Sequence, residues 1–445
     1  MSSDRRTNGG GDHAGGGSGA RYAVLSSDCH AGLPNPQYRP WLDPEHAAAF
    51  DEFLVQRAAM EAELAGTGLR NAEFAEEWER DNAEGLRGGW DAARRDRELD
   101  ADGVAGEVIF PDADAVSGGA SAPFGAGLGA SGATEGPLAL AGARAHNRWL
   151  AELCATSPER RAGVAIVPIL HDIPAAVAEI ERARASGLRG GILIPSMWAP
   201  YPPYHDPRYD PIWAACQDLD LPVHVHSGAA DKESYGEHVG IYVAEVRWWS
   251  MRGLWFLLWA GKFDQFPRLK FVVTECGAFW APDLLWTSDI VYDREHAAKK
   301  MGSQLTAALH MRPSDYFDRN CAIGASNTRR RELARRYEIG VGNLMWGNDF
   351  PHPEGTWPHT KEWLRKAFSD IPVDETAAIL GGNAADVYGF DVDALTPLAE
   401  QVGPTPDELG QTGAEADGRL DKWTDLAAAG RPWLTGKEAL ELPVG

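Results

Sequence analysis

Short apolar runs and amphipathic stretches alternate along most of the chain. Eight runs have the length and composition of buried strands: 22–30, 106–111, 163–168, 190–195, 221–226, 269–275, 320–325 and 344–348. Nearly all of them are followed by a stretch whose apolar residues have helical spacing. Strands that alternate with helices predict a parallel sheet, because a crossover must connect each parallel pair.

The number of strand–helix units narrows the fold class. Eight units predict an α/β protein with a (β/α)8 TIM barrel over residues 21–392, and a doubly wound open sheet is the main alternative. Residues 31–95 interrupt the alternation and predict a helical insertion after the first strand. Residues 1–20 are rich in glycine and serine and predict a disordered tail. We expect residues 393–445 to form a C-terminal extension that packs along the barrel or across a subunit interface.

Composition and charge exclude several kinds of partner. The net charge of -23 argues against nucleic acid and anionic membranes, which both need a basic surface. No apolar run is long enough for a membrane span, and none follows Arg5 and Arg6 as in a signal peptide. The five cysteines form no paired motif, which favours a reduced, cytoplasmic setting. We therefore expect a cytoplasmic protein with a small-molecule substrate.

Ionisable side chains lie at the ends of four of the predicted strands. In a (β/α)8 barrel these ends meet at one face, where the chemistry occurs. An unpaired carboxylate at the end of a buried strand would cost several kcal/mol, so Asp349 needs a cation, a metal ion or a proton-transfer partner. The candidates, in chain order, are Asp28 and His30, His224 and His226, Glu275, and Asp349 with His352 just beyond it.

Histidines and carboxylates around one cavity are typical ligands of a divalent metal ion, such as Zn²⁺ or Mn²⁺. Each pair has an ordinary structural explanation when taken alone. Asp28 and His30 could be a hydrogen-bonded pair, Glu275 a helix cap, and Asp349 a turn residue before Pro351. Their joint position at the strand ends of one barrel favours the metal site.

Five segments resemble the amidohydrolase-related family of metal-dependent barrels. The likeness is strongest to the decarboxylase branch that includes aminocarboxymuconate semialdehyde decarboxylase and γ-resorcylate decarboxylase. The segments follow the family's order over about residues 21–390. They are SSDCH at 26–30, LPVHVH at 221–226, FVVTECG at 271–277, MWGNDFPH at 345–352 and GGNA at 381–384.

The resemblance implies a set of metal ligands and a role for one of them. Carried over position by position, the ligands fall on Asp28, His30, His226 and Asp349, and Asp349 also moves protons. The family implies a divalent ion, with Zn²⁺ as our first expectation and Mn²⁺ as the alternative. It also implies a homodimer, for which the insertion and the C-terminal extension offer surface.

Three positions depart from the family's common pattern. Asp28 stands where a histidine is common in the first strand, and Glu275 stands where the sixth strand often carries a histidine. No lysine lies near Pro195, where some members have a carboxylated lysine that bridges two metal ions. These departures predict one metal ion and weaker, more exchangeable binding, because carboxylates favour harder ions.

The resemblance favours a carbon–carbon lyase over a hydrolase. In a non-oxidative decarboxylase of a small aromatic or unsaturated acid, Asp349 or His224 would relay a proton to the carbon that loses CO₂. The alternative is a hydrolase of an amide, ester or lactone, in which Asp349 would take the proton of a metal-bound water and His224 or His352 would steady the oxyanion. A second alternative is a non-catalytic barrel that binds a small ligand and has lost its metal.

The chain contains 17 tryptophans, several of them near the later strand ends. Most are expected to pack helices against the barrel. We expect Trp280 and Trp357 to line an aromatic pocket, and Glu275 and His352 to lie beside the ligands or the substrate. Arg247 and Arg252 could bind a substrate carboxylate, although helix arginines are more often ion-paired or at the surface.

Overall fold

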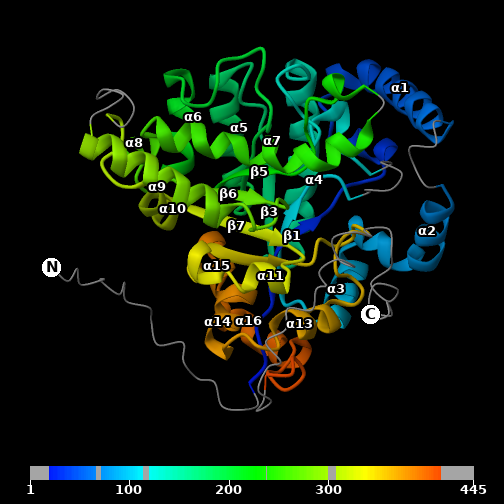
Figure 1. Cartoon of the computed structure of the whole chain (residues 1–445). Helices are drawn as coiled ribbons and strands as arrows, with labels where there is room; N and C mark the ends of the chain where they lie inside the picture. The colour runs from blue at the N-terminus through cyan, green and yellow to red at the C-terminus, as the bar shows by residue number, and fades with distance from the viewer. Residues whose placement is uncertain (1–19, 67–71, 114–119, 237, 299–306, 412–445) are drawn as a thin grey trace.

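The computed structural model describes residues 20–411 except for four internal gaps, at 67–71, 114–119, 237 and 299–306. Eight parallel strands form one sheet in sequence order (Figure 1). They are β1 Leu25–His30, β2 Gly106–Phe110, β3 Arg161–Ile166, β4 Gly191–Leu193, β5 Val223–His226, β6 Phe271–Thr274, β7 Cys321–Ser326 and β8 Leu344–Gly347.

Backbone hydrogen bonds also join the two ends of this sheet. The Asp349 N–H donates to the Asp28 carbonyl at 2.9 Å, and the His30 N–H donates to the Phe350 carbonyl at 2.6 Å. The last strand therefore meets the first, and the sheet is a (β/α)8 barrel. The predicted fold class is confirmed, all eight predicted strands are present, and the open-sheet alternative is wrong.

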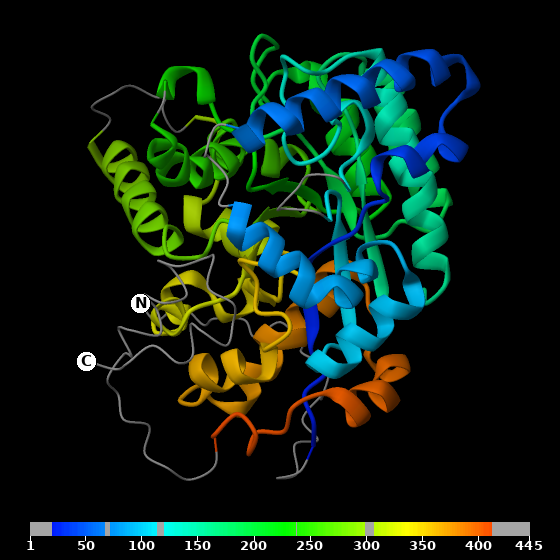
Figure 2. The same cartoon turned by 90° about the vertical axis from the view of Figure 1, so that its right-hand side faces the viewer.

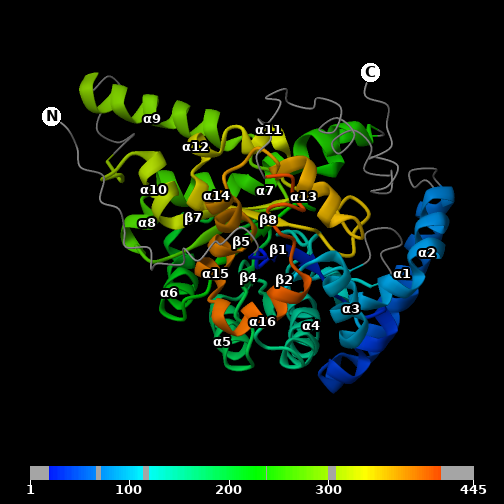
Figure 3. The same cartoon turned by 90° about the horizontal axis from the view of Figure 1, so that it is seen from below.

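Helices surround the barrel and cover its lower end (Figures 1 and 3). Most of them follow a strand, as the alternation predicts. The α-helices are α1 Ala47–Gly66, α2 Ala72–Leu86, α3 Ala92–Asp102, α4 Pro137–Ala155, α5 Ile173–Ala185, α6 Asp210–Asp218, α7 Val239–Trp259, α8 Lys262–Gln265, α9 Ala281–Ala298, α10 Pro313–Asn320, α11 Arg330–Leu333, α12 Arg336–Ile339, α13 Thr360–Phe368, α14 Val373–Ala377, α15 Asn383–Tyr388 and α16 Val392–Val402. No helix within the described residues is long and apolar enough to cross a membrane.

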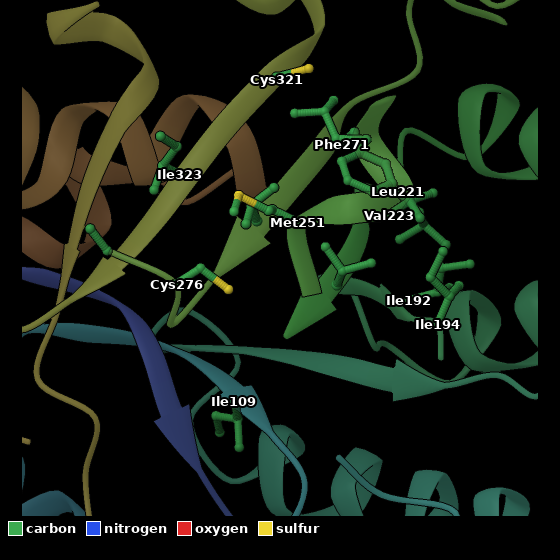
Figure 4. Close-up of a cluster of buried hydrophobic side chains, with 14 of the residues drawn as sticks. Ile109, Ile192, Ile194, Leu221, Val223, Met251, Phe271, Cys276, Cys321 and Ile323 are labelled. Atoms are coloured by element: carbon green, nitrogen blue, oxygen red, sulfur yellow. The ribbon is translucent and has the colours of Figure 1, made fainter. Parts of the chain in front are cut away.

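The strand residues separate the apolar core into two layers, because neighbouring side chains point to opposite faces. Val223, Phe271 and Ile323 belong to the layer between the barrel and its helices (Figure 4). Val108 and Val272 belong to a second cluster, which also contains residues of α15 and α16. The beginning of the predicted C-terminal extension thus packs on the barrel, whereas residues 412–445 and 1–19 lie outside the described residues.

The insertion after β1 contains α1, α2 and the beginning of α3, and it lies along one side of the barrel (Figures 1 and 2). A buried ion pair joins it to the sheet. The guanidinium of Arg95 in α3 donates to both carboxylate oxygens of Glu107 in β2 at 2.6–2.9 Å, and to the carbonyl of His30 at 2.8 Å. Burial opposes ionisation, yet the charge of Arg95 keeps the pKa of Glu107 below its ordinary value.

We expect Arg95→Met to lower the free energy of unfolding by about 3–5 kcal/mol, because Glu107 would remain buried with a weaker partner. Arg161 is that partner, with its Nε at 3.4 Å from Glu107. Denaturant unfolding followed by tryptophan fluorescence measures the change. Arg87→Met is the control and should cost less than about 1 kcal/mol, because its ion pair with Asp91 is exposed. Equal losses in the two variants would contradict the role of the buried pair.

Candidate metal centre

Two of the acidic site residues stand on unusual backbone. Asp349 and Glu275 have φ values of 60° and 55°, in the left-handed region that residues other than glycine rarely adopt. Glu275 directly follows β6 and Asp349 is the second residue after β8, where the chain turns out of the barrel. Such backbone costs of order 1–3 kcal/mol per residue and persists where the surrounding structure holds it, typically at functional sites.

Four of the predicted residues meet at this end of the barrel. The Nε2 atom of His30 lies 3.4 Å from Asp28 Oδ1 and 3.2 Å from Asp349 Oδ1. The Nε2 atom of His226 lies 3.2 Å from Asp28 Oδ1. All four side chains are buried. The structure therefore brings together two imidazole nitrogens and two carboxylate oxygens from β1, β5 and the second residue after β8.

The other ring nitrogens determine what these atoms can do. The Nδ1–H of His30 donates to the Pro111 carbonyl at 2.7 Å, and the Nδ1–H of His226 donates to the Ser227 carbonyl at 2.8 Å. Because a neutral imidazole carries one N–H, both Nε2 atoms then present lone pairs. Backbone carbonyls hold metal-binding histidines in this tautomer in many metal sites.

The Nε2 lone pairs of His30 and His226 face carboxylate oxygens, and two acceptors repel each other unless a proton or a metal ion lies between them. His30 Nε2 and Asp349 Oδ1 are buried and have no hydrogen-bond partner among the residues that the structure describes. Such orphaned polar atoms call for a ligand, because leaving them unpaired costs about 1–3 kcal/mol or more. His30 Nε2 lies 3.2–3.4 Å from both carboxylates, and His226 Nε2 lies 3.2 Å from Asp28. Donor atoms of Asp28, His30 and His226 all lie within 4.8 Å of one another, and Asp349 joins His30 and His352 in a second such group, so nitrogen and carboxylate oxygen atoms of the kind that bind a divalent metal ion gather here.

Protons compete with a metal ion for this site. Burial opposes ionisation of Asp28, yet the neighbouring His226 and His30 hold the pKa of its carboxyl well below the usual range. Burial also opposes protonation of His226, but Asp28 raises the pKa of that imidazole. Metal binding should therefore release protons from the histidines and weaken as the pH falls.

His352 contacts two residues of this cluster. Its ring stacks on that of His30 with centroids 3.9 Å apart, and its Nδ1 lies 3.3 Å from Asp349 Oδ1. Its Nε2–H donates to the Asp112 carbonyl at 2.8 Å. Burial favours the neutral ring, but the charge of Asp349 raises the pKa of His352 well above its ordinary value. His352 can therefore store a proton next to Asp349.

Glu275 lies beside this cluster, with its Oε2 3.3 Å from His226 Nδ1. Burial and then Asp349 raise the pKa of Glu275 well above its ordinary value. Two residues join the site that sequence reasoning did not select. Glu354 places a carboxylate oxygen within 4.8 Å of oxygens of Glu275 and Asp349, and the Ser326 hydroxyl donates to Asp28. Their signals were weak: Glu354 follows His352 closely, and Ser326 ends a strand.

His224 does not join the cluster, which corrects the role that we expected for it. Its Nε2–H donates to the Gly190 carbonyl at 2.9 Å, and its ring stacks on Tyr388. Both contacts lie toward the N-terminal end of the barrel, because Gly190 precedes β4 and α15 covers that end. Burial lowers the pKa of His224 to about 3, so the ring is neutral near pH 7, and its one N–H is bound to the Gly190 carbonyl.

The two predicted pocket tryptophans are both core residues. Trp280 donates to the Gly277 carbonyl at 2.9 Å and packs on Trp255 and Phe317. Trp357 donates to Glu98 at 3.1 Å and packs edge-on against aromatic rings of α2 and the loop after β8. Neither lines the hollow beside His226, which is formed by residues within 126–139, 166–168 and 193–196.

The two arginines of α7 make contacts of their own. The Arg252 guanidinium lies 4.8 Å from the centroid of the Trp198 ring, and that of Arg247 lies 6.0 Å from the centroid of Phe279. These contacts account for both side chains as cations stacked on aromatic rings. Neither arginine is among the residues that line the hollow beside His226.

The sequence also matches a known protein family. The model of a family described as amidohydrolase matches residues 28–390. The γ-resorcylate decarboxylase of Rhodococcus jostii is 27% identical over 272 residues, which cover 56% of this chain and 77% of that protein.

Two solved structures share the fold. The 5-carboxyvanillate decarboxylase of Sphingomonas paucimobilis has a TM-score of 0.57 at 22% identity and covers 83% of this chain and 100% of its own. A dihydroxybenzoic acid decarboxylase of Polaromonas, solved with bound manganese and 2-nitroresorcinol, has a TM-score of 0.54 at 19% identity. It covers 83% of this chain and 97% of its own.

Loss of a group that only hydrogen-bonds to a metal ligand typically weakens metal binding by roughly 10–100-fold. We expect Asp28→Asn and His226→Asn each to weaken it by more than this, because each removes a ligand. Titration of the metal-free protein with Mn²⁺ or Zn²⁺ by calorimetry, with metal content from mass spectrometry, measures this. His224→Gln is the matched control, since its ring bonds to Gly190 instead. A loss of metal in His224→Gln as large as in His226→Asn would contradict the assignment.

The buried, neutral state of His224 predicts that stability depends on pH. Because burial lowers the pKa of His224 to about 3, the unfolded chain binds a proton below pH about 6.5 that the folded chain does not. Stability should therefore fall as the pH drops, with His224 contributing about 2 kcal/mol between pH 7 and pH 5.

His224→Gln should lose about 2 kcal/mol less over this range, measured by urea unfolding at each pH. His238→Gln is the control at an exposed histidine and should follow the wild type. If His224→Gln kept the full wild-type slope, the neutral, buried state of His224 would be refuted.

Proposed function

This chain belongs to the amidohydrolase family, and we propose that it is a metal-dependent decarboxylase of a small aromatic carboxylic acid. The observation that carries the proposal is the cluster of Asp28, His30, His226 and Asp349, in which His30 Nε2 and Asp349 Oδ1 are buried without a hydrogen-bond partner among the described residues. The proton stored on His352 beside this cluster supports the same reaction. The relatives that are named as decarboxylases of aromatic acids give further support.

We propose one divalent ion held by these four residues. Two carboxylates beside two imidazoles suit both Zn²⁺ and Mn²⁺, and the carboxylates favour the harder Mn²⁺. The manganese bound in the Polaromonas decarboxylase supports Mn²⁺ over our first expectation of Zn²⁺. When bound, such an ion supplies Lewis acidity that holds and polarises the carboxylate of the substrate.

The residues of the chain supply the proton that the reaction needs. Loss of CO₂ from an aromatic acid breaks the bond between the ring and its carboxyl carbon, and the electron pair stays on the ring carbon until a proton arrives. The Nε2–H of His352 is bound to the Asp112 carbonyl, so its movable proton is on Nδ1, facing Asp349 Oδ1 at 3.3 Å. We propose that Asp349 passes this proton to the ring carbon and that solvent restores it.

We keep a cytoplasmic homodimer as part of this proposal. All five cysteines are free and buried, which suits a reducing compartment. Exposed apolar side chains on α7 and α9, among them Val243 and Trp286, offer surface that a second copy could cover. Light scattering of the purified protein measures the mass directly, and a monomer at micromolar concentration would exclude the dimer.

We expect the manganese-loaded protein to release CO₂ from one or more hydroxybenzoates, and Asp349→Asn to lower kcat at least 100-fold, because proton transfer by a positioned side chain contributes about 10²–10⁴-fold. Coupled assay of CO₂ and chromatography of the phenolic product measure the reaction. His224→Gln is the control and should keep wild-type turnover.

The assay also separates the rival functions. Product from a panel of lactones, esters and amides, with no CO₂ from any acid, would replace the lyase with a hydrolase. A protein that neither holds Mn²⁺ or Zn²⁺ nor regains it on soaking would instead support the non-catalytic barrel.

A further inference from the structure

The hollow beside His226 has an almost entirely apolar wall. Residues 166–168 after β3, residues 193–196 after β4 and residues within 126–139 surround it, with Leu128, Ile166 and Leu193 among them. His226, one of the proposed metal ligands, also lines the hollow. An aromatic ring bound through its carboxylate at the metal centre would bury its far side against this wall.

One carboxyl group interrupts the apolar wall. Glu135 precedes α4, and its Oε2 accepts hydrogen bonds from the N–H groups of Leu170 at 2.6 Å and His171 at 2.8 Å. Its Oε1 is buried and has no hydrogen-bond partner in the part of the chain that the structure describes. The backbone bonds hold the side chain in place, so the unpaired oxygen is fixed, and an unpaired buried acceptor indicates a missing partner.

The other polar groups of the lining already have partners. The Ser196 hydroxyl donates to the His226 carbonyl at 3.2 Å, and the His226 ring belongs to the metal centre. No lysine or arginine is among the described residues that line the hollow. A second carboxylate on the substrate would therefore meet no cation here, and it would face the carboxyl of Glu135.

The electrostatics of Glu135 narrow the choice of partner further. Burial raises the pKa of Glu135 to about 7, although the N–H groups of Leu170 and His171 oppose this shift. Near neutral pH the group is therefore both an ionised acceptor and a neutral donor. A hydroxyl group pairs with both forms, because it can donate to a carboxylate and accept from a carboxylic acid.

We propose that Glu135 recognises a ring hydroxyl of the substrate, on the part of the ring that lies away from the reacting carboxylate. This inference rests on the proposed decarboxylase function and deepens it. Glu135 selects aromatic acids that carry such a hydroxyl over the same acids without it, and over acids with a second carboxylate.

Two variants separate hydrogen bonding from loop structure. In Glu135→Gln, the amide oxygen can keep the bonds from Leu170 and His171, and an NH₂ group then replaces the free oxygen. Glu135→Met keeps the approximate volume of the side chain and removes both the acceptor for Leu170 and His171 and the free oxygen. Glu181→Gln, an exposed glutamate on α5, is the matched control.

The ligands are 2-hydroxybenzoate and its 3-, 4-, 5- and 6-hydroxy derivatives, with benzene-1,3-dicarboxylate as the diacid. Calorimetry on the manganese-loaded protein measures the dissociation constants, and CO₂ release is recorded separately. In the wild type, the dissociation constant of the best dihydroxybenzoate should be at least about 10-fold lower than that of 2-hydroxybenzoate, since a hydrogen bond to a charged group is worth about 1.5–3 kcal/mol.

Glu135→Gln and Glu135→Met should remove most of this preference and leave the binding of 2-hydroxybenzoate nearly unchanged, and Glu181→Gln should retain the preference. Three results would each overturn the inference: the Glu135 variants bind the dihydroxybenzoate and 2-hydroxybenzoate equally more weakly than the wild type does, they bind both as tightly as the wild type does, or the wild type itself shows no preference. If the preference depends on Glu135 but no acid releases CO₂, the proposed function fails and the recognition by Glu135 stands. If CO₂ is released without that dependence, only the inference fails.

Discussion

The structure of the site depends on one electrostatic constraint: two carboxylates and two imidazoles share a buried space in which their lone pairs face one another. Asp28 and Asp349 come from opposite ends of the chain, and the closure of the barrel between β1 and β8 brings them together. Backbone carbonyls at Pro111 and Ser227 direct the ring nitrogens inward. Such a cluster is stable only with a cation in it, whether protons on the histidines or a metal ion.

The insertion after β1 supports this constraint from outside the barrel. The Arg95 guanidinium binds the carbonyl of His30 while it neutralises Glu107, and it stacks on the ring of Phe350. One buried side chain therefore contacts both of the segments that close the barrel. The same ion pair that attaches the insertion to the sheet therefore also holds the backbone of His30.

Two histidines of β5 have different surroundings and different pKa values because they lie at different heights in the barrel. His226 lies at the end of β5 among carboxylates, which raise its pKa, whereas His224 lies one inward step below among carbonyl and aromatic groups, and burial lowers its pKa. The first can bind a metal ion or a proton, and the second holds the barrel interior together. His352, and not His224, lies beside Asp349.

Local sequence determined the strands and the barrel and placed Asp28, His30 and Asp349 at strand ends, because apolar runs and the two-residue period of strands need no distant partner to be recognised. The choice of His226 over His224 as a ligand came from the resemblance to the amidohydrolase-related family. Local sequence did not determine which inward-facing histidine reaches the site, since neighbouring strands set that height. Trp280 and Trp357 were misplaced because aromatic residues serve cores and pockets alike. Glu354 and Glu135 lie in loops whose paths depend on contacts with distant segments. Only the tertiary structure could place their carboxyl groups beside the metal centre and its hollow.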